Sequence, residues 1–215
     1  MQNIVIIGSG RYTGVVLDII LAERKYKVDA ILCDFAESET QIMGFNIGKL
    51  SLLDNNLPRR GIVAVGDNYR RERYVADILA RYPDFEFITT IHPTAVVSNN
   101  VKLGFGSAIH AFSVIKYNAS IGNHCDINCH TTIAHDVEIG DYSTVGAGGI
   151  VGGYTKIGFG SSINLGSIIK DRIVIGDYVV IGMASVVTKP ITSNTFSCGN
   201  PARIMRKREK NEGFL

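Results

Sequence analysis

The chain has 215 residues, enough for one large domain or two small ones. Its formal net charge of +2 and its sequence pI of about 8.3 give no strong positive field, which argues against a nucleic-acid partner. Charged residues make up 20% of the chain and no charge-free apolar run approaches the ~18 residues of a membrane span, so we expect no membrane segment.

The first ninety residues alternate between buried strands and amphipathic helices. Continuous apolar runs indicate strands buried on both faces, and apolar residues at helical spacing indicate the helices between them. In chain order we predict a strand at Asn3–Ile7, a helix at Val15–Glu23, strands at Lys27–Cys33 and Ile62–Val65, a helix at Tyr69–Arg81 and a strand at Phe85–Ile88. This order predicts a small parallel Rossmann-like sheet, an α/β domain, over residues 1–89.

A glycine-rich loop follows the first predicted strand. Gly8, Ser9 and Gly10 stand between that strand and the next helix, where free backbone N–H groups suit a phosphate. The spacing G-x-G-x-x-x-G is one residue longer than the dinucleotide fingerprint, and Asp34 lies twenty residues after Gly14, about where an acidic residue meets a ribose. We therefore expect a nucleotide here; the alternative is a tight turn with no ligand.

A six-residue period governs the next hundred residues. From Ile91 to Val187 every sixth residue is Ile, Leu or Val, without a slip of register. At an apolar fraction of 46%, seventeen preset positions would all be apolar in about two of a million chance trials. Such a period is typical of a parallel β-helix with three flat sides, here about six coils, on the order of 27 Å tall. We assign residues 90–190 to it.

Small residues and glycines complete the repeat. Small side chains stand four residues after most anchors, and we expect both positions to point into the prism. Glycines recur every eighteen residues at one corner, at Gly104, Gly122, Gly140, Gly158 and Gly176. Because no long insertion interrupts the coils, we expect an active site built from coil surfaces and from a neighbouring subunit.

Histidines and cysteines on the prism suggest two chemistries. His135, followed by Asp136, can serve as a general base oriented by a carboxylate. His130 and His135 also form an H-x4-H pair like that of the γ-class carbonic anhydrases, but the third ligand position falls on Thr94, so we predict no metal. The four cysteines form no C-x-x-C pair and the N-terminus reads as a strand, so a reduced, cytoplasmic protein is expected.

Residues 191–215 form a C-terminal segment and tail. The run from Arg206 to Lys210 is basic, and we expect it to be frayed. Two interpretations stay open: it contacts the phosphates of an anionic cofactor, or it is a solvated charge run.

Several segments together resemble the sialic acid O-acetyltransferases and UDP-4-amino-sugar N-acetyltransferases, the hexapeptide-repeat sugar acyltransferases. They are the glycine-rich loop, IVAVGDNYRR (62–71), IHPTAVVS (91–98), Ile127-Asn128, His135-Asp136 with Ile139-Gly140-Asp141, and Gly199-Asn200-Pro201-Ala202. The resemblance implies a left-handed β-helix, a homotrimer, acetyl-CoA in the groove between adjacent prisms, and a nucleotide-linked amino sugar held by the N-terminal domain.

The same resemblance implies roles for individual residues. His135 takes a proton from the sugar nucleophile and Asp136 orients the imidazole. Gly153, Lys189 and Arg203 are predicted to bind acetyl-CoA. Nucleotide-sugar contacts are predicted at Gly8, Ser9, Gly10 and Asp34, and at Thr144, which stands where some N-acetyltransferases carry a second histidine.

The predicted function is acetyl-CoA-dependent N-acetylation of a nucleotide-linked amino sugar in bacterial surface-glycan synthesis. The alternatives are O-acetylation of a sugar of the sialic acid type, a zinc enzyme like the γ-carbonic anhydrases, and a non-catalytic scaffold.

Overall fold

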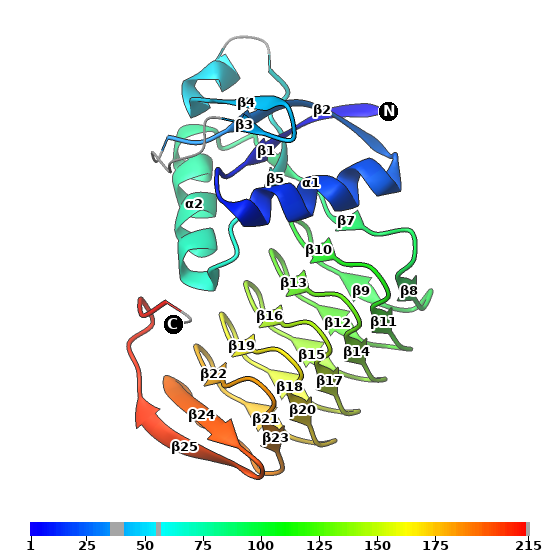
Figure 1. The fold of residues 1–215 in the computed structure, drawn as a ribbon, viewed down its shortest axis with the longest axis vertical. Coiled ribbons are helices and arrows are strands. Elements are labelled where there is room, and N and C mark those ends of the chain that lie inside the picture. Colours follow the sequence, from blue (N-terminus) through cyan, green and yellow to red (C-terminus); the bar gives the residue numbers. More distant parts are fainter. Residues whose placement is uncertain (35–40, 55–56, 214–215) are drawn as a thin grey trace.

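The structure, a computed structural model, describes residues 1–34, 41–54 and 57–213. An α/β domain sits at the N-terminal end of a long triangular prism of stacked coils (Figure 1). The predicted fold class, a parallel Rossmann-like sheet followed by a left-handed β-helix, is confirmed. Among the described residues, no helix is both long and apolar enough to cross a membrane.

The N-terminal domain has a sheet of strand order β3-β4-β2-β1-β5-β6. Its elements are β1 (Gln2–Ile7), α1 (Arg11–Glu23), β2 (Tyr26–Leu32), β3 (Gln41–Ile42), β4 (Phe45–Gly48), a 3₁₀ helix (Leu50–Asp54), β5 (Arg60–Val63), α2 (Asn68–Arg81) and β6 (Glu86–Phe87). The predicted parallel strands pair as expected, β1 lying between β2 and β5. The antiparallel β3–β4 pair was not predicted.

Alternate residues of β1 pack against the two helices. Ile4 and Ile6 share a buried cluster with residues of α1, whereas Val5 and Ile7 share another with residues of α2. The continuous apolar run therefore reflects a strand covered on both faces, as its sequence predicted.

The prism has three parallel sheets, which we call face 1, face 2 and face 3. Face 1 contains β7 (Thr90–Ile91), β10 (Ala108–Ile109), β13 (Asp126–Ile127), β16 (Thr144–Val145), β19 (Ser162–Ile163), β22 (Val180–Ile181), β24 (Thr195–Gly199) and β25 (Ala202–Lys207). Face 2 contains β8 (Val96–Val97), β11 (Val114–Ile115), β14 (Thr132–Ile133), β17 (Ile150–Val151), β20 (Ile168–Ile169) and β23 (Val186–Val187). Face 3 contains β9 (Lys102–Leu103), β12 (Ser120–Ile121), β15 (Glu138–Ile139), β18 (Lys156–Ile157) and β21 (Val174–Ile175).

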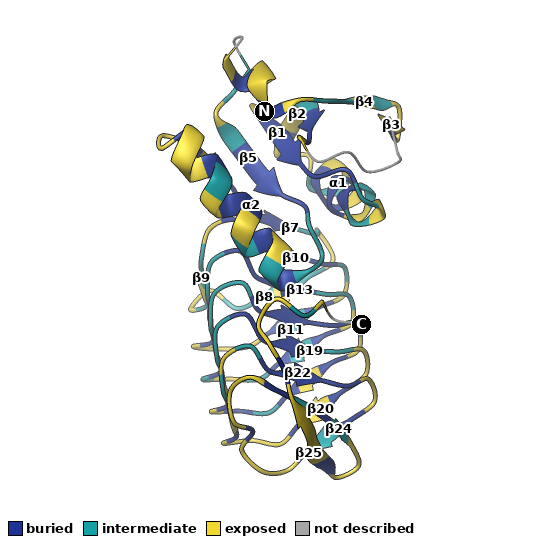
Figure 2. Cartoon of the chain, turned by 90° about the vertical axis from the view of Figure 1, so that its left-hand side faces the viewer, coloured by how far each residue is buried: buried dark blue, intermediate teal, exposed yellow. Residues whose placement is uncertain are grey.

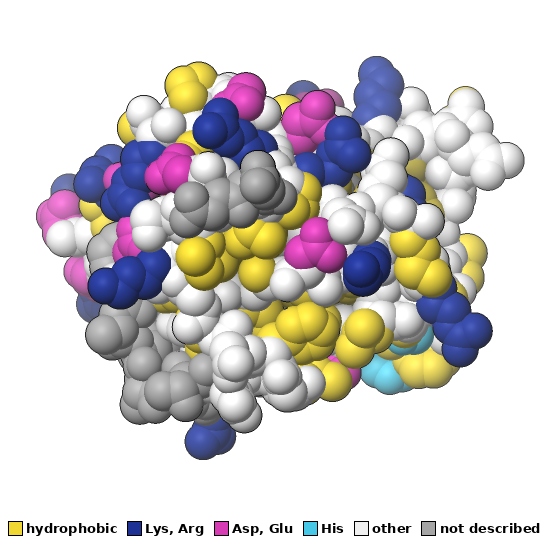
Figure 3. Space-filling model, turned by 90° about the horizontal axis from the view of Figure 1, so that it is seen from above, with side chains coloured by type: hydrophobic (Ala, Val, Ile, Leu, Met, Phe, Trp, Pro, Cys, Tyr) yellow, Lys and Arg dark blue, Asp and Glu magenta, His cyan; other side chains and the backbone are white. Residues whose placement is uncertain are grey.

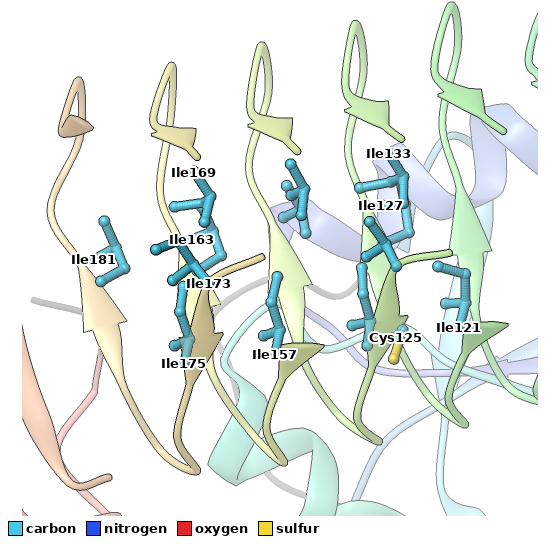
Figure 4. Close-up of a cluster of buried hydrophobic side chains, with 14 of the residues drawn as sticks. Ile121, Cys125, Ile127, Ile133, Ile157, Ile163, Ile169, Ile173, Ile175 and Ile181 are labelled. Atoms are coloured by element: carbon cyan, nitrogen blue, oxygen red, sulfur yellow. The ribbon is translucent and has the colours of Figure 1, made fainter. Parts of the chain in front are cut away.

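The six-residue anchors point into the prism and fill it. Strands pair with partners eighteen residues away, such as Ile109 with Ile127, so like residues stack coil upon coil. The anchors and small residues form one buried cluster, part of which is drawn in Figure 4. At the glycine corner a Cβ on Gly104 would lie 2.5 Å from the carbonyl carbon of Gly122, which is why this position carries no side chain.

The faces differ in what covers them. The N-terminal domain covers the outer side of face 1 (Figures 1 and 2). At the C-terminal end of the prism, β22 of this face pairs with β24 of the C-terminal β24–β25 hairpin. Its outward residues Asp126, Thr144 and Ser162 are 4%, 9% and 0% exposed. Face 2 and face 3 keep their outward side chains at the surface of the single chain.

The basic run belongs to an ordered strand and the residues just after it, so the expectation of a frayed basic tail was wrong. β25 pairs antiparallel with β24 through Lys207. Arg208 is buried and its guanidinium donates to the carbonyl oxygen of Tyr178 at 3.0 Å. The tail's first residues therefore extend face 1.

A buried arginine joins the two domains. Arg71, in α2, is 2% exposed. Its guanidinium donates to the carbonyl oxygens of His124 and Tyr142 on the prism, at 2.8 and 3.1 Å. It also donates to Val65 and Gly66 in its own domain, at 2.8 and 3.1 Å. The N-terminal domain is thereby held on face 1.

The surface charges are mixed on the end of the molecule formed by the N-terminal domain. Seen from above, Lys and Arg side chains stand among Asp and Glu side chains (Figure 3). This pattern agrees with the low net charge of the sequence and gives no support to a nucleic-acid partner.

We predict that His124 makes stability depend on pH. It is 1% exposed in a ring stack with Tyr142, and no described residue forms a hydrogen bond with its Nδ1. Burial, with a smaller contribution from Arg71, lowers the pKa of His124 from 6.5 to about 4. The unfolded chain therefore binds the extra proton first, and the free energy of unfolding should fall by up to about 3 kcal/mol as pH drops from 6.5 toward 4.

Denaturant unfolding of the wild type and of His124→Phe across this range measures the effect. The phenylalanine keeps an aromatic ring in the stack and cannot titrate, so the variant should lose this part of the pH dependence. Equal slopes for the two proteins would contradict the prediction.

Candidate active site

His135 lies at the corner between face 2 and face 3. The chain leaves β14 at Ile133 and turns through residues 134–136. Asp136 has a left-handed backbone with φ of 57°, and the equivalent residues of neighbouring coils, Asn118, Tyr154 and Arg172, have φ of 58°, 59° and 60°. Because the same turn repeats every eighteen residues, their side chains form a column along this edge, which we call the His135 corner.

The imidazole and the carboxylate of the predicted pair touch. Nδ1 of His135 lies 2.8 Å from Oδ2 of Asp136, with the two side chains 50% and 26% exposed. Hydrogen bonds from Asn118 and then from His135 hold the pKa of Asp136 below its usual value, so it stays ionised at neutral pH. An ionised acceptor keeps a proton on Nδ1 and leaves the lone pair of Nε2 for a reacting proton.

Gly153 leaves space beside the free edge of the ring. A Cβ at this position would lie 3.0 Å from Cε1 and 3.1 Å from Nε2 of His135. The Tyr154 ring meets the imidazole edge-on at 5.1 Å, and the Arg172 guanidinium covers that tyrosine at 4.5 Å. The structure thus brings His135, Asp136 and Gly153 together, with the reactive nitrogen open toward the glycine.

The other two predicted cofactor residues lie further along the prism. Lys189 follows β23 and lies at the same corner as His135, fifty-four residues and therefore three coils further along. At the spacing of stacked strands, three coils separate the two residues by roughly 14 Å along the prism. Arg203 is exposed on β25.

A small cavity of 140 Å³ lies at the carboxyl ends of β1 and β5. Ser9 and Gly10 line it, as do Arg11 and Arg70, which sequence reasoning missed. Among residues 1–34, 41–54 and 57–213, no side chain caps the start of α1, whereas Asp67 caps α2 by accepting from the Arg70 amide at 2.8 Å. The open helix start and two arginines suit an anion.

Gly8 has a structural reason to be glycine. Its φ is 149°, and a Cβ would lie 2.6 Å from the carbonyl oxygen of Ala64. It therefore permits the close approach of the loop to the end of β5, while its neighbours Ser9 and Gly10 line the cavity.

Asp34 and Thr144 lie away from these two places. Arg81 and the Leu50 amide bind the two oxygens of Asp34. Burial alone would raise the pKa of Asp34, but these contacts hold it below its usual value. The Thr144 hydroxyl donates to Asn68 at 2.7 Å in the contact between the domains, on the opposite side of the prism from His135.

The histidines of the zinc alternative have other contacts. His130 stacks on Phe112 with ring centroids 5.1 Å apart. The hydroxyl of Thr94 forms a hydrogen bond of 2.9 Å with Nδ1 of His92. Within the described part of the chain, no three His, Cys, Asp or Glu side chains are grouped as metal ligands. Cys125 is buried in the prism and donates to the Gly140 carbonyl, and burial raises its pKa to about 12.

Comparisons with known proteins agree with this layout. Residues 3–90 match the family model of the PglD N-terminal domain. PerB from Caulobacter crescentus, solved with CoA and GDP-perosamine, is 28% identical with a TM-score of 0.87, covering 96% of this chain and 98% of its own. The acetyltransferase domain of PglB from Neisseria gonorrhoeae, solved with acetyl coenzyme A, is 26% identical with a TM-score of 0.85, covering 95% of this chain and 99% of its own.

The resemblance to the hexapeptide-repeat sugar acyltransferases is confirmed. WeeI from Acinetobacter baumannii, 23% identical with a TM-score of 0.75 over 95% of this chain and all of its own, shares the fold. The Caulobacter perosamine N-acetyltransferase has also been solved with a single histidine replaced by asparagine or by alanine. A search of curated protein sequences gave no match.

We predict that Gly153→Ala lowers turnover without unfolding the protein. The added methyl would press on Cε1 and Nε2 of His135 and close the space where a reacting proton must arrive. We expect kcat to fall by about tenfold or more, because a misplacement of 1 Å can cost about a hundredfold.

Thermal unfolding checks that the fold survives, and Gly148→Ala offers a matched control. Gly148 is a turn glycine of a neighbouring corner where a Cβ would meet nothing closer than 3.9 Å, although its φ of 70° adds some backbone strain. A Gly153→Ala enzyme as active as the wild type would show that Nε2 needs no space on that side.

Proposed function

We propose that the protein transfers the acetyl group of acetyl-CoA to the amine of a nucleotide-linked amino sugar, in bacterial surface-glycan synthesis. The observation that carries the proposal is the His135–Asp136 pair, whose Nε2 is left open by Gly153 on a fold shared with sugar N-acetyltransferases. The structural relatives bind CoA, acetyl-CoA and a GDP-linked amino sugar, which supports the same co-substrates here.

His135 acts as the general base. As the sugar nitrogen attacks the thioester carbonyl, the new C–N bond forms and Nε2 accepts the proton released by the amine. The C–S bond then breaks and the CoA sulfur leaves, taking a proton from the imidazolium. Asp136 keeps the ring in the orientation and tautomer that this requires. Backbone N–H groups near Gly153 are suited to hold the thioester oxygen.

The N-terminal cavity binds the nucleotide diphosphate. At 140 Å³ it is small, and its polar lining includes the start of α1, Arg11 and Arg70, together with Asp67, whose carboxylate caps α2. Such a site recognises phosphate oxygens and leaves the base and the sugar to extend outside it. Gly8, Ser9 and Gly10 form its loop, while Asp34 and Thr144 would require a rearrangement to contact the ligand.

The two half-sites lie on different sides of one chain. The N-terminal domain covers face 1 (Figure 1). His135 stands between β14 and β15, at the corner where face 2 meets face 3, across the prism from face 1. A complete site therefore combines the nucleotide cavity of one copy with the His135 corner of another. This arrangement supports a homotrimer with acetyl-CoA in the groove between prisms, where Gly153, Lys189 and Arg203 would contact it.

Face 2 is the surface through which copies pack. Its outward residues are aligned from coil to coil and nearly all are apolar: Val96, Val114, Thr132, Ile150, Ile168 and Val186. Val96, Ile150 and Ile168 are 61%, 43% and 43% exposed. Face 3 instead carries charged residues, including the Lys156–Glu138 ion pair of 2.9 Å. An apolar stripe on one of three faces marks an interface.

The nature of the acceptor atom and the location remain predictions. O-acetylation of a sugar hydroxyl uses the same base and is the alternative to N-acetylation. No disulfide joins the four cysteines in the described part of the chain, which is in keeping with the proposed cytoplasmic location.

We predict that purified protein releases CoA thiol when given acetyl-CoA and a nucleotide-linked amino sugar. A panel with GDP, UDP and dTDP carriers, each with amino and hydroxy sugars, separates N- from O-acetylation by mass spectrometry of the product. His135→Ala should lower kcat by about 10² to 10⁴ because the base is lost. No thiol release with any sugar would refute the function, and full activity of His135→Ala would refute the role of the base.

We also predict that Ile168→Glu dissociates the assembly. It places a carboxylate in the apolar stripe of face 2, where burial of an unpaired charge is costly. Val174→Glu is the matched control, since Val174 holds the same place in its strand on face 3 and is 52% exposed. Analytical ultracentrifugation should find a trimer for the wild type and the control, and monomer for Ile168→Glu. A trimeric Ile168→Glu would place the interface elsewhere.

A further inference from the structure

Asn118 lies directly against the carboxylate that orients the candidate base. Its side-chain Nδ2 donates to Oδ1 of Asp136 at 2.6 Å, while the other oxygen of that carboxylate faces Nδ1 of His135 at 2.8 Å. Across the described residues these are the only two hydrogen-bond partners recorded for the Asp136 side chain. Asn118, Asp136 and His135 therefore form a continuous chain of contacts.

The coil geometry explains why this contact forms. Asn118 and Asp136 occupy the same place in successive coils, eighteen residues apart, and both have left-handed backbones. Asparagine and aspartate adopt that conformation more readily than most residues. Their short side chains emerge from equivalent turns of coils that are stacked about 4.8 Å apart, a separation that an amide donor and a carboxylate acceptor can bridge.

The contact fixes a group that would otherwise rotate. Asp136 is at a corner, with its side chain 26% exposed, and its carboxylate could turn away from the ring into water. An amide donor on one oxygen holds the other oxygen toward His135. Because an amide does not titrate, this restraint is the same at every working pH.

We propose that Asn118 is a positioning residue, which acts through Asp136 to keep the proton of His135 on Nδ1 and the lone pair on Nε2. The proposal rests on the proposed function of His135 as base. Within the described residues, the recorded hydrogen bond of the Asn118 side chain is to Asp136 and not to the imidazole, so its proposed effect on turnover passes through the carboxylate.

A matched pair elsewhere on the prism separates positioning from structural support. Asn123 donates from Nδ2 to Oδ2 of Asp141 at 3.2 Å, again across eighteen residues, but at the corner between face 3 and face 1. The Asn123→Ala variant removes the same kind of coil-to-coil contact away from His135.

The first test compares the steady-state kinetics of Asn118→Ala, Asn118→Asp and Asn123→Ala. Removing the amide should lower kcat by about 10- to 100-fold, the usual effect of losing a group that orients a functional side chain. The KM for acetyl-CoA should stay within about twofold. Asn118→Asp, similar in shape but without the donor and with a like charge, should fall at least as far, and Asn123→Ala should match the wild type. Wild-type kcat in both Asn118 variants would overturn the proposal.

A second test asks whether Asn118 works through Asp136. In an Asp136→Ala background the change Asn118→Ala should cause no further loss of kcat, because the group it positions is gone. Independent, additive losses would overturn the proposal.

A third test needs no activity. In protein labelled with ¹⁵N histidine, the side-chain shifts of His135, assigned with His135→Gln, report which nitrogen carries the proton. The wild type and Asn123→Ala should show the Nδ1–H form, and Asn118→Ala should lose it. If no sugar is acetylated but this shift is seen, the proposed function fails while the positioning role stands. An unchanged Nδ1–H signal in Asn118→Ala would overturn the role.

Discussion

The constancy of the eighteen-residue coil is the constraint on which the rest of the structure depends. Parallel pairing joins each strand to the strand eighteen residues on, so residues at one corner become columns. Gly153 lies one coil after His135, and Asp136 lies one coil after Asn118. Because His135 and Asp136 are neighbours in the same turn, all four residues meet at one corner. A single inserted residue would rotate the following side chains off this corner and put the glycine away from the imidazole.

Arg71 supplies the second fixed relation, that between the two domains. A buried guanidinium is costly unless its donors are satisfied, and here carbonyl oxygens from both domains accept from it. Asn68 adds a hydrogen bond to the Ser161 carbonyl at 3.1 Å. These contacts hold α2 on face 1 and so place the cavity beside Ser9 and Gly10 across the prism from His135. The separation of the two candidate sites follows from a few buried polar contacts.

Local sequence patterns were enough to predict the repeat, but they could not predict the contacts between segments that lie far apart in the chain. The period of six determined which residues fill the prism, because each hexapeptide repeats the same local geometry. In the sequence, Arg71 is one of several arginines in a predicted helix. Its neighbours give no sign that it donates to the carbonyl oxygen of His124, more than fifty residues away. Thr144 was predicted as a substrate contact from the family resemblance alone, and its hydrogen bond to Asn68 in the contact between the domains could not be read from its neighbours in the sequence. The C-terminal hairpin was not predicted because the charged residues of β25 resemble a solvated tail, and the partner strand of β25, β24, has no repeat pattern.

The His135 corner is exposed in the single chain, which bears on the proposed chemistry. With half of the imidazole in water, a developing charge at the thioester would be screened and solvated rather than held by fixed dipoles. The apolar stripe of face 2 ends at this same corner, so a neighbour packed on it would exclude water from one side of the ring. Under the proposed function, the surface proposed for assembly and the candidate base are therefore adjacent for one physical reason: a neighbouring prism on face 2 would shield the reacting groups from water.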